Sequence, residues 1–246
     1  MRPVHPLPNK RYNGIEQEAY HLCRILEALE EWPATVKSTK TPALCGRVLG
    51  YMLQEAPTAQ GHSNVASQIL LCQNDDDPYC QLEALATLYL DEFIYKYVVI
   101  TIATALPPNY PVIWSNLDLF GLVDLDANID TDSKSVHSLQ NMLTLNVTTQ
   151  GDFDRMLAWF EADSRMPHHY RFVLNDPRTG KLKKSEVLDM RSLSNLLPPP
   201  SKEYLRLHEA CAKVTYLSGG DVYADRLSHE AQEAGESVWG DEDLAV

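Results

Sequence analysis

The sequence predicts an α+β protein in which a bundle of helices precedes a short antiparallel sheet and carboxy-terminal helices. Apolar residues recur at helical spacing through the first hundred positions, and two short segments rich in apolar and β-branched residues flank a Gly-containing turn near residue 180. A proline-rich stretch at 107–111 separates the two patterns. We therefore expect a helical amino-terminal region at 1–106 and an α+β region at 107–246.

Four helices are predicted in the first region, and their ends have recognisable signals. Pro33 and Pro57 end the first two helices, because proline cannot continue a helix. Asp75-Asp76-Asp77 supplies N-cap carboxylates and Pro78 a first-turn proline for the fourth. The predicted ranges are 15–32, 44–56, 63–72 and 78–97.

The second region is predicted to mix helices, loops and strands. Its Pro, Gly, Ser and Asp clusters mark the turns between them. In chain order the expected elements are a helix at 112–121, an acidic loop at 124–135, a strand at 142–147, a helix from Phe153 towards Phe160, strands at 170–174 and 186–190, a helix from Ser201 to Gly219, a helix at 222–234 and a frayed tail at 240–246.

The charge balance is acidic, with a formal net charge of -13. Nucleic-acid binding depends mainly on attraction between basic side chains and phosphates, so the chain as a whole is predicted to bind nucleic acid weakly. One local basic cluster, in NDPRTGKLKK, is the candidate nucleic-acid-binding surface; its members are Arg178, Lys181, Lys183 and Lys184. The alternative interpretation is a solvated hairpin turn, because Asp-Pro and Thr-Gly-Lys are turn sequences.

Cysteine usage and hydropathy favour an intracellular protein without a membrane span. The five cysteines include no C-x-x-C pair and sit among apolar residues, which predicts buried thiols in a reducing compartment. The amino terminus has no apolar core of the signal-peptide type. The run YVVITIATAL is about half of the roughly 20 residues that a membrane-spanning helix needs.

The acidic loop DLDANIDTDSKS places oxygen-bearing side chains at alternating positions, as a calcium-binding EF-hand loop does. The position that requires glycine holds Ile129, and the position of the bidentate glutamate holds Ser135. We therefore predict a solvated acidic loop.

Several stretches resemble, in the same order, the fungal HNH-nuclease-like proteins. RVLGYMLQEAP and VASQILLCQNDDDPYCQLEALATLYLDEFI are similar to the helical region of that family. VHSLQNMLTLNVTTQGDFDRMLAWFE with HHYRFV resembles the family's carboxy-terminal part, and PPPSKEYLRLHEACAKVTYLSG resembles its tail. The likeness spans residues 47–219 and implies a helical region followed by a ββα metal-nuclease core, here degenerate.

The resemblance implies three active-site residues: a general-base His on a β-hairpin, an Asn, and a metal-binding His on the following helix. Asn141 matches the Asn, and His137 matches a position outside the catalytic set. The metal His would fall at Gln150, whose neutral amide is a poor replacement for imidazole. The hairpin is missing, because the 14 residues at 97–110 contain no His.

These departures predict a catalytically inactive HNH-nuclease-like protein, a binding or regulatory paralogue for which no cofactor is expected. Two alternatives stay open. The chain could be an active metal-dependent endonuclease whose divalent metal is held by unrecognised ligands, such as the acidic loop with His168 or His169. Only one of these histidines could contribute, because adjacent side chains of an extended segment point to opposite faces. The third interpretation is an incomplete gene model that lacks the exon encoding the hairpin.

Overall fold

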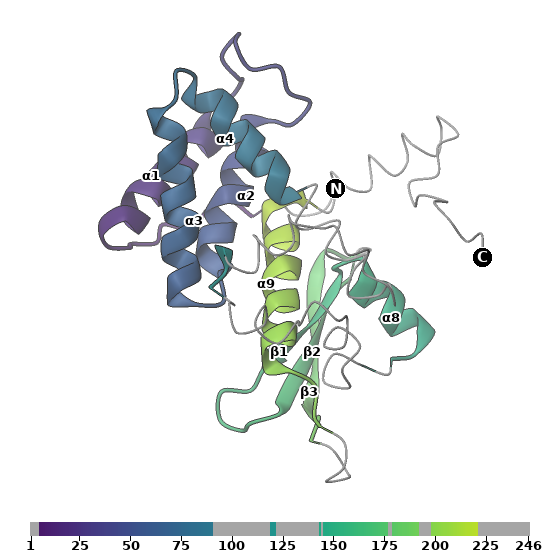
Figure 1. Cartoon of the computed structure of the whole chain (residues 1–246). Helices are drawn as coiled ribbons and strands as arrows, with labels where there is room; N and C mark the ends of the chain where they lie inside the picture. The colour runs from purple at the N-terminus through teal and green to yellow at the C-terminus, as the bar shows by residue number, and fades with distance from the viewer. Residues whose placement is uncertain are drawn as a thin grey trace, which may run out of the picture.

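The computed structural model describes residues 5–90, 119–121, 143, 145–176, 179–191 and 198–220, and it has an α+β fold (Figure 1). Within these residues, four α-helices form the amino-terminal part, and a three-stranded antiparallel sheet with two further helices follows. The elements are α1 (Gly14–Ala28), α2 (Pro42–Glu55), α3 (Ala59–Leu71), the short 3-10 helix η1 (Cys72–Asn74), α4 (Pro78–Thr87), α8 (Val147–Asp154), β1 (Ala158–Ala162), β2 (His169–Asp176), β3 (Lys181–Asp189) and α9 (Lys202–Ser218).

The predicted N-caps of α4 and α9 are confirmed, whereas α1 ends at Ala28, before the predicted stop at Pro33. The Asp77 carboxylate accepts a hydrogen bond from the Cys80 N–H at 3.1 Å, and Pro78 begins α4. Ser201 caps α9 by accepting a hydrogen bond from the Tyr204 N–H. Gly219 ends α9 with a φ of +79°, a left-handed conformation that glycine adopts without steric cost.

Helices α1 and α2 pack closely because Gly46 has no side chain. A Cβ atom at Gly46 would lie 2.5 Å from the Glu27 nitrogen and 2.6 Å from the Cys23 carbonyl oxygen. Most residues of α2 are buried, since α1, α3, α4 and α9 all contact it. Helix α2 is therefore the centre of the bundle.

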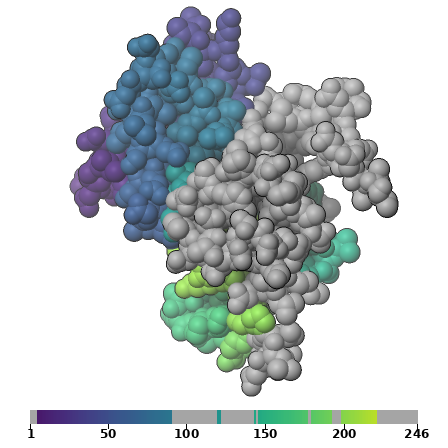
Figure 2. Space-filling view, in the orientation of Figure 1, coloured from purple at the N-terminus to yellow at the C-terminus, as the bar shows by residue number. Residues whose placement is uncertain are grey.

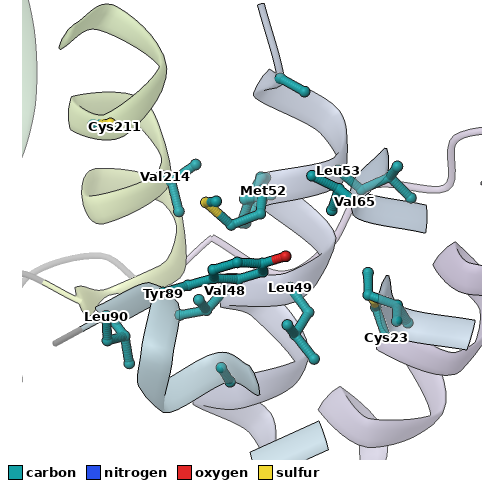
Figure 3. Close-up of a cluster of buried hydrophobic side chains, with 14 of the residues drawn as sticks. Cys23, Val48, Leu49, Met52, Leu53, Val65, Tyr89, Leu90, Cys211 and Val214 are labelled. Carbon is teal, nitrogen blue, oxygen red and sulfur yellow. The ribbon is translucent and has the colours of Figure 1, made fainter. Parts of the chain in front are cut away.

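Helix α9 belongs to the core of the amino-terminal bundle although it lies more than a hundred residues further along the chain. Figure 3 shows Val214 of α9 facing Met52 of α2, with Tyr89 beside them. Leu207, Cys211 and Ala212 are in the same buried cluster. The predicted boundary at 106/107 lies outside the described residues, but side chains from both sides of it share one core.

The sheet has the strand order β1-β2-β3, and both pairs are antiparallel. Trp159 of β1 is opposite Val173 of β2, and both are buried. The hairpin predicted around the turn is confirmed, with strands longer than expected. Strand β3 is mostly exposed, whereas β1 contacts α9. Helix α9 thus lies between the bundle and the sheet (Figure 1).

The surface view separates these parts by colour. Figure 2 shows the helices of the bundle at the upper left, with residues of the sheet region and α9 in green below them.

Among the described residues, no helix is both long and apolar enough to cross a membrane.

The cysteines are free thiols, as the sequence predicts. Four of them, Cys23, Cys45, Cys72 and Cys211, are buried, and Cys80 is half-buried. Burial raises the pKa of the Cys23 and Cys211 thiols well above the ordinary value, so both stay protonated and serve as packing groups.

Candidate functional site

Gln150, the residue at the metal-ligand position of the resemblance, lies in α8 with an exposed side chain. The Asn146 side chain caps this helix by accepting a hydrogen bond from the Thr149 N–H at 3.0 Å, and the Gln150 N–H donates to the Asn146 carbonyl at 2.8 Å. The side chain of position 150 is therefore presented to solvent by a well-formed helical turn. Asn141 lies outside the described residues.

The local assignment around Gln150 differs from the sequence prediction. The expected strand at 142–147 is wrong in its described residues, because Leu143 and Leu145 are irregular and Val147 begins a helix. The expected helix from Phe153 towards Phe160 is also wrong, since β1 starts at Ala158. Pairing with β2 overrides the helical spacing of these apolar residues, as tertiary context commonly does.

Helix α8 is attached to α9 by a buried histidine. The His208 ring stacks on Phe153 with centroids 3.5 Å apart, and its Nε2 lies 3.1 Å from the Phe153 carbonyl oxygen. Because a carbonyl oxygen only accepts, we assign the hydrogen to Nε2. Complete burial lowers the pKa of His208 from 6.5 to about 4, so the imidazole is neutral at physiological pH.

The three lysines of the basic cluster lie on β3, and two of them pair with carboxylates. Lys183 Nζ lies 2.6 Å from Asp176, and Lys184 Nζ lies 2.6 Å from Glu161. Lys181 is exposed at the start of β3, and Arg178 lies outside the described residues. A phosphate at this surface would have to compete with these two carboxylates for Lys183 and Lys184.

His168 and His169, the alternative metal ligands, lie where β2 begins. His168 has a φ of +59°, and its Nδ1 is buried without a hydrogen-bond partner in the described part of the chain. His169 Nδ1 lies 2.8 Å from the Pro167 carbonyl, and its Nε2 lies 4.0 Å from Asp189. Hydrogen bonds from Arg191 hold the pKa of Asp189 far below its usual range, which keeps that carboxylate charged.

A network of three glutamates around one lysine joins the bundle to the sheet, and sequence analysis missed it. Lys213 Nζ of α9 lies 2.7 Å from Glu209, 3.9 Å from Glu161 of β1 and 4.0 Å from Glu55 of α2. Only the Glu209–Lys213 spacing of four residues is visible as a helical pair in the sequence. Glu55 and Glu161 are brought to the same lysine by the tertiary fold.

Burial and pairing act on this network in opposite directions. Burial raises the pKa of Glu209, and the nearby Lys213 partly offsets that rise. Burial by itself would lower the pKa of Lys213, but the hydrogen bond and charge of Glu209 raise it overall. The lysine is therefore firmly protonated, and its charge compensates carboxylates that come from three different elements.

The donor set of the described residues does not fit a divalent metal. Among residues 5–90, 145–176, 179–191 and 198–220, no group of three or more His, Cys, Asp or Glu side chains is arranged to hold a metal ion. The three glutamates around Lys213 converge on its ammonium group, which occupies the place that a cation would take. The acidic loop at 124–135 lies outside the described residues.

In comparisons with known proteins, no family model, curated protein or solved structure matches the chain. The resemblance to HNH-nuclease-like proteins therefore stays a prediction.

Proposed function

We propose that this chain is a non-catalytic HNH-nuclease-like protein with a binding or regulatory role inside the cell. The observation that supports it is Gln150, an exposed neutral amide in a capped helix at the position of the family's metal ligand. An amide oxygen binds transition metals far less strongly than an imidazole nitrogen does. Without that ligand, the cation that would stabilise the leaving oxygen in phosphodiester cleavage is not held.

The charge distribution supports weak contact with nucleic acid. The net charge of -13 repels phosphate, and Lys183 and Lys184 are paired with carboxylates of β2 and β1. We therefore place the binding role on a protein partner rather than on DNA or RNA.

The test is a cleavage assay on supercoiled plasmid with the purified full chain. Mg²⁺, Mn²⁺, Ni²⁺ and Zn²⁺ are supplied separately, and nicked and linear products are measured. We expect no metal-dependent cleavage. Nicking that copurifies with the chain and disappears in the Asn141→Ala variant contradicts the proposal.

The second candidate is an active nuclease with different ligands, and one observation favours it. His168 has a buried, unpartnered Nδ1 in the described part of the chain, and His169 stands beside it near Asp189. If these residues support catalysis, metal-dependent nicking will be lost in His168→Ala or His169→Ala and kept in His62→Ala. Sequencing the transcript between the codons for Lys96 and Pro111 tests whether an exon encoding the hairpin is missing.

A further inference from the structure

The segment His5–Asn9 lies against α1 and α2 and is held there mainly through its backbone. The Leu7 N–H donates to the Glu27 carboxylate, with both oxygens at 3.1 Å. The Tyr20 hydroxyl donates to the Pro8 carbonyl at 2.6 Å. The Tyr51 hydroxyl lies 2.9 Å from the Pro6 carbonyl and 3.2 Å from that of His5.

These contacts satisfy the carbonyls of His5, Pro6 and Pro8 and the N–H of Leu7. Pro6 and Pro8 have no N–H, so Leu7 carries the only backbone donor of the three residues, and Glu27 accepts it. Burial raises the pKa of Tyr20 and of Tyr51 to about 12, so both hydroxyls remain donors at any physiological pH. Side chains of α1 and α2 therefore make the hydrogen bonds to this backbone that a neighbouring strand would make in a sheet.

A single side chain of the segment is buried, and a glycine makes room for it. Leu7 is 6% exposed, whereas Pro6, Pro8 and Asn9 are exposed. A Cβ atom at Gly50 would lie 2.5 Å from Leu7 Cδ2, and its three nearest atoms all belong to Leu7. Gly50 of α2 thus leaves the space that the Leu7 side chain fills.

One apolar anchor with side-chain hydrogen bonds to an extended backbone is the pattern of peptide-recognition grooves. Residues before proline avoid the helical region, so His5 and Leu7 are already biased towards the extended form. A Pro-Leu-Pro segment consequently loses little conformational entropy when it binds. None of the contacts requires that the segment belong to the same chain.

We infer that Tyr20, Glu27, Gly50 and Tyr51 form a docking groove for a partner protein that carries a leucine between two prolines in an extended segment. The chain's own residues 5–9 occupy this groove as an intramolecular competitor. Only residues 10–13 separate the segment from α1, so its effective concentration is on the order of millimolar or higher. A partner must displace it to bind.

Two kinds of full-length variant test the groove and its occupant separately: one releases residues 5–9, and the other blocks the site where Leu7 binds. Leu7→Asp places a carboxylate beside Glu27 in an apolar pocket and releases the segment while the groove stays intact; Leu7→Ala is a milder version. Gly50→Ala puts a methyl group where Leu7 packs, since the three nearest atoms to an added Cβ all belong to Leu7, and alanine is a better helix former than glycine. The probe is a fluorescein-labelled peptide, HPLPNK, titrated by fluorescence anisotropy, with HPDPNK as the control peptide.

We expect HPLPNK to bind Leu7→Asp at least about tenfold more tightly than the wild type, because the competitor is gone. Adding Gly50→Ala to Leu7→Asp should abolish binding, and HPDPNK should bind none of the proteins. A folded Leu7→Asp or Leu7→Ala chain that does not bind HPLPNK overturns the inference. If both variants fail to fold, residues 5–9 are an integral part of the core and the inference is also wrong. A concentration-dependent wild-type dimer that Gly50→Ala dissociates would instead identify a second copy as the occupant.

Discussion

The imidazole of His208 lies face to face with the ring of Phe153, with a centroid distance of 3.5 Å and an interplanar angle of 4°. This contact joins α8 to α9 in the smaller apolar cluster, which also contains Phe160, Tyr170 and Leu205. A neutral ring suits such a stack, whereas a buried imidazolium would lose its hydration there.

Stability should therefore fall on acidification across the titration range of His208. Its pKa is about 4 in the folded chain and 6.5 in the unfolded reference, so between these pH values only the unfolded state takes up the proton. The free energy of unfolding should decrease by about 3 kcal/mol from this residue as pH falls from about 6.5 to about 4, and this contribution should level off below. Urea unfolding at half-unit pH steps measures the change.

The control is His208→Gln, which keeps an N–H donor for the Phe153 carbonyl but does not titrate. Between pH 4 and 6.5, the free energy of unfolding of this variant should change less with pH than that of the wild type. If the free energy of unfolding changes equally with pH in both proteins, His208 is not the source of the acid sensitivity.

Removing the charge of Lys213 should destabilise the protein. Lys213→Met removes the lysine that Glu55 and Glu209 share, whereas Glu161 keeps its ion pair with Lys184. We expect a loss of roughly 2 kcal/mol in the free energy of unfolding, below the roughly 3–5 kcal/mol of a fully buried pair because the lysine side chain is 26% exposed. Combining Lys213→Met with Glu209→Gln should recover part of the loss in a double-mutant cycle. Additive effects would show that the network is not coupled.

Two glycines in helices should respond to alanine in opposite directions. Gly46→Ala places a methyl group 2.5 Å from backbone atoms of α1, which cannot move aside, and should cost roughly 2 kcal/mol of stability or more. Gly151 of α8 has no atom within 4 Å of an added Cβ, so Gly151→Ala should stabilise by about 0.5–1 kcal/mol through helix propensity. Thermal unfolding of both variants checks the contrast, and a destabilised Gly151→Ala would refute the assignment of α8.

Nucleic-acid binding should be weak and should not depend on Lys183 or Lys184. Because both lysines are paired with carboxylates, we expect a dissociation constant weaker than about 1 µM for labelled duplex at physiological salt. The double variant Lys183→Glu with Lys184→Glu should bind no differently from Lys181→Glu. Submicromolar binding that collapses only in the double variant would establish the hairpin as a nucleic-acid-binding surface.

Supplying the metal ligand that the HNH resemblance implies should not produce cleavage. Gln150→His would raise one imidazole from α8, but a general base typically contributes a further 10²–10⁴-fold in rate, and none is supplied. We predict no detectable nicking with Mg²⁺, Mn²⁺, Ni²⁺ or Zn²⁺. Detectable metal-dependent nicking by Gln150→His would mean that a base already exists in the chain. Gln150→Ala is the matched control.

The helices of the bundle could be predicted from the sequence because their signals are local. Asp77 with Pro78 acts within one helical turn of the residues that it caps, and so does Ser201. The prediction around Gln150 was wrong because the secondary structure there depends on contacts with residues far away in the sequence. Trp159 and Phe160 have helical spacing from Phe153, but pairing with distant residues of β2 makes them a strand. The network at Lys213 was missed because its glutamates come from three separate elements.

The candidate site was only partly accessible to sequence reasoning. The hairpin turn and the exposure of Lys181, Lys183 and Lys184 follow from composition, since charged residues around a Gly-containing turn face water. Their ion pairs with Asp176 and Glu161 do not, because sheet register decides which side chains meet. Likewise, nothing in HPLPNK indicates that Glu27 and Gly50 receive Leu7.

The position of α9 has a consequence for how the chain is made. The Arg47 side chain donates a hydrogen bond to the Ser218 carbonyl at 2.8 Å, a contact across 171 positions, and Val214 fills the space beside Met52. During synthesis, the amino-terminal helices emerge long before the helix that completes their packing. A nascent chain that stops short of residue 220 should thus expose an apolar seam along α2, which makes it a substrate for chaperones until α9 leaves the ribosome.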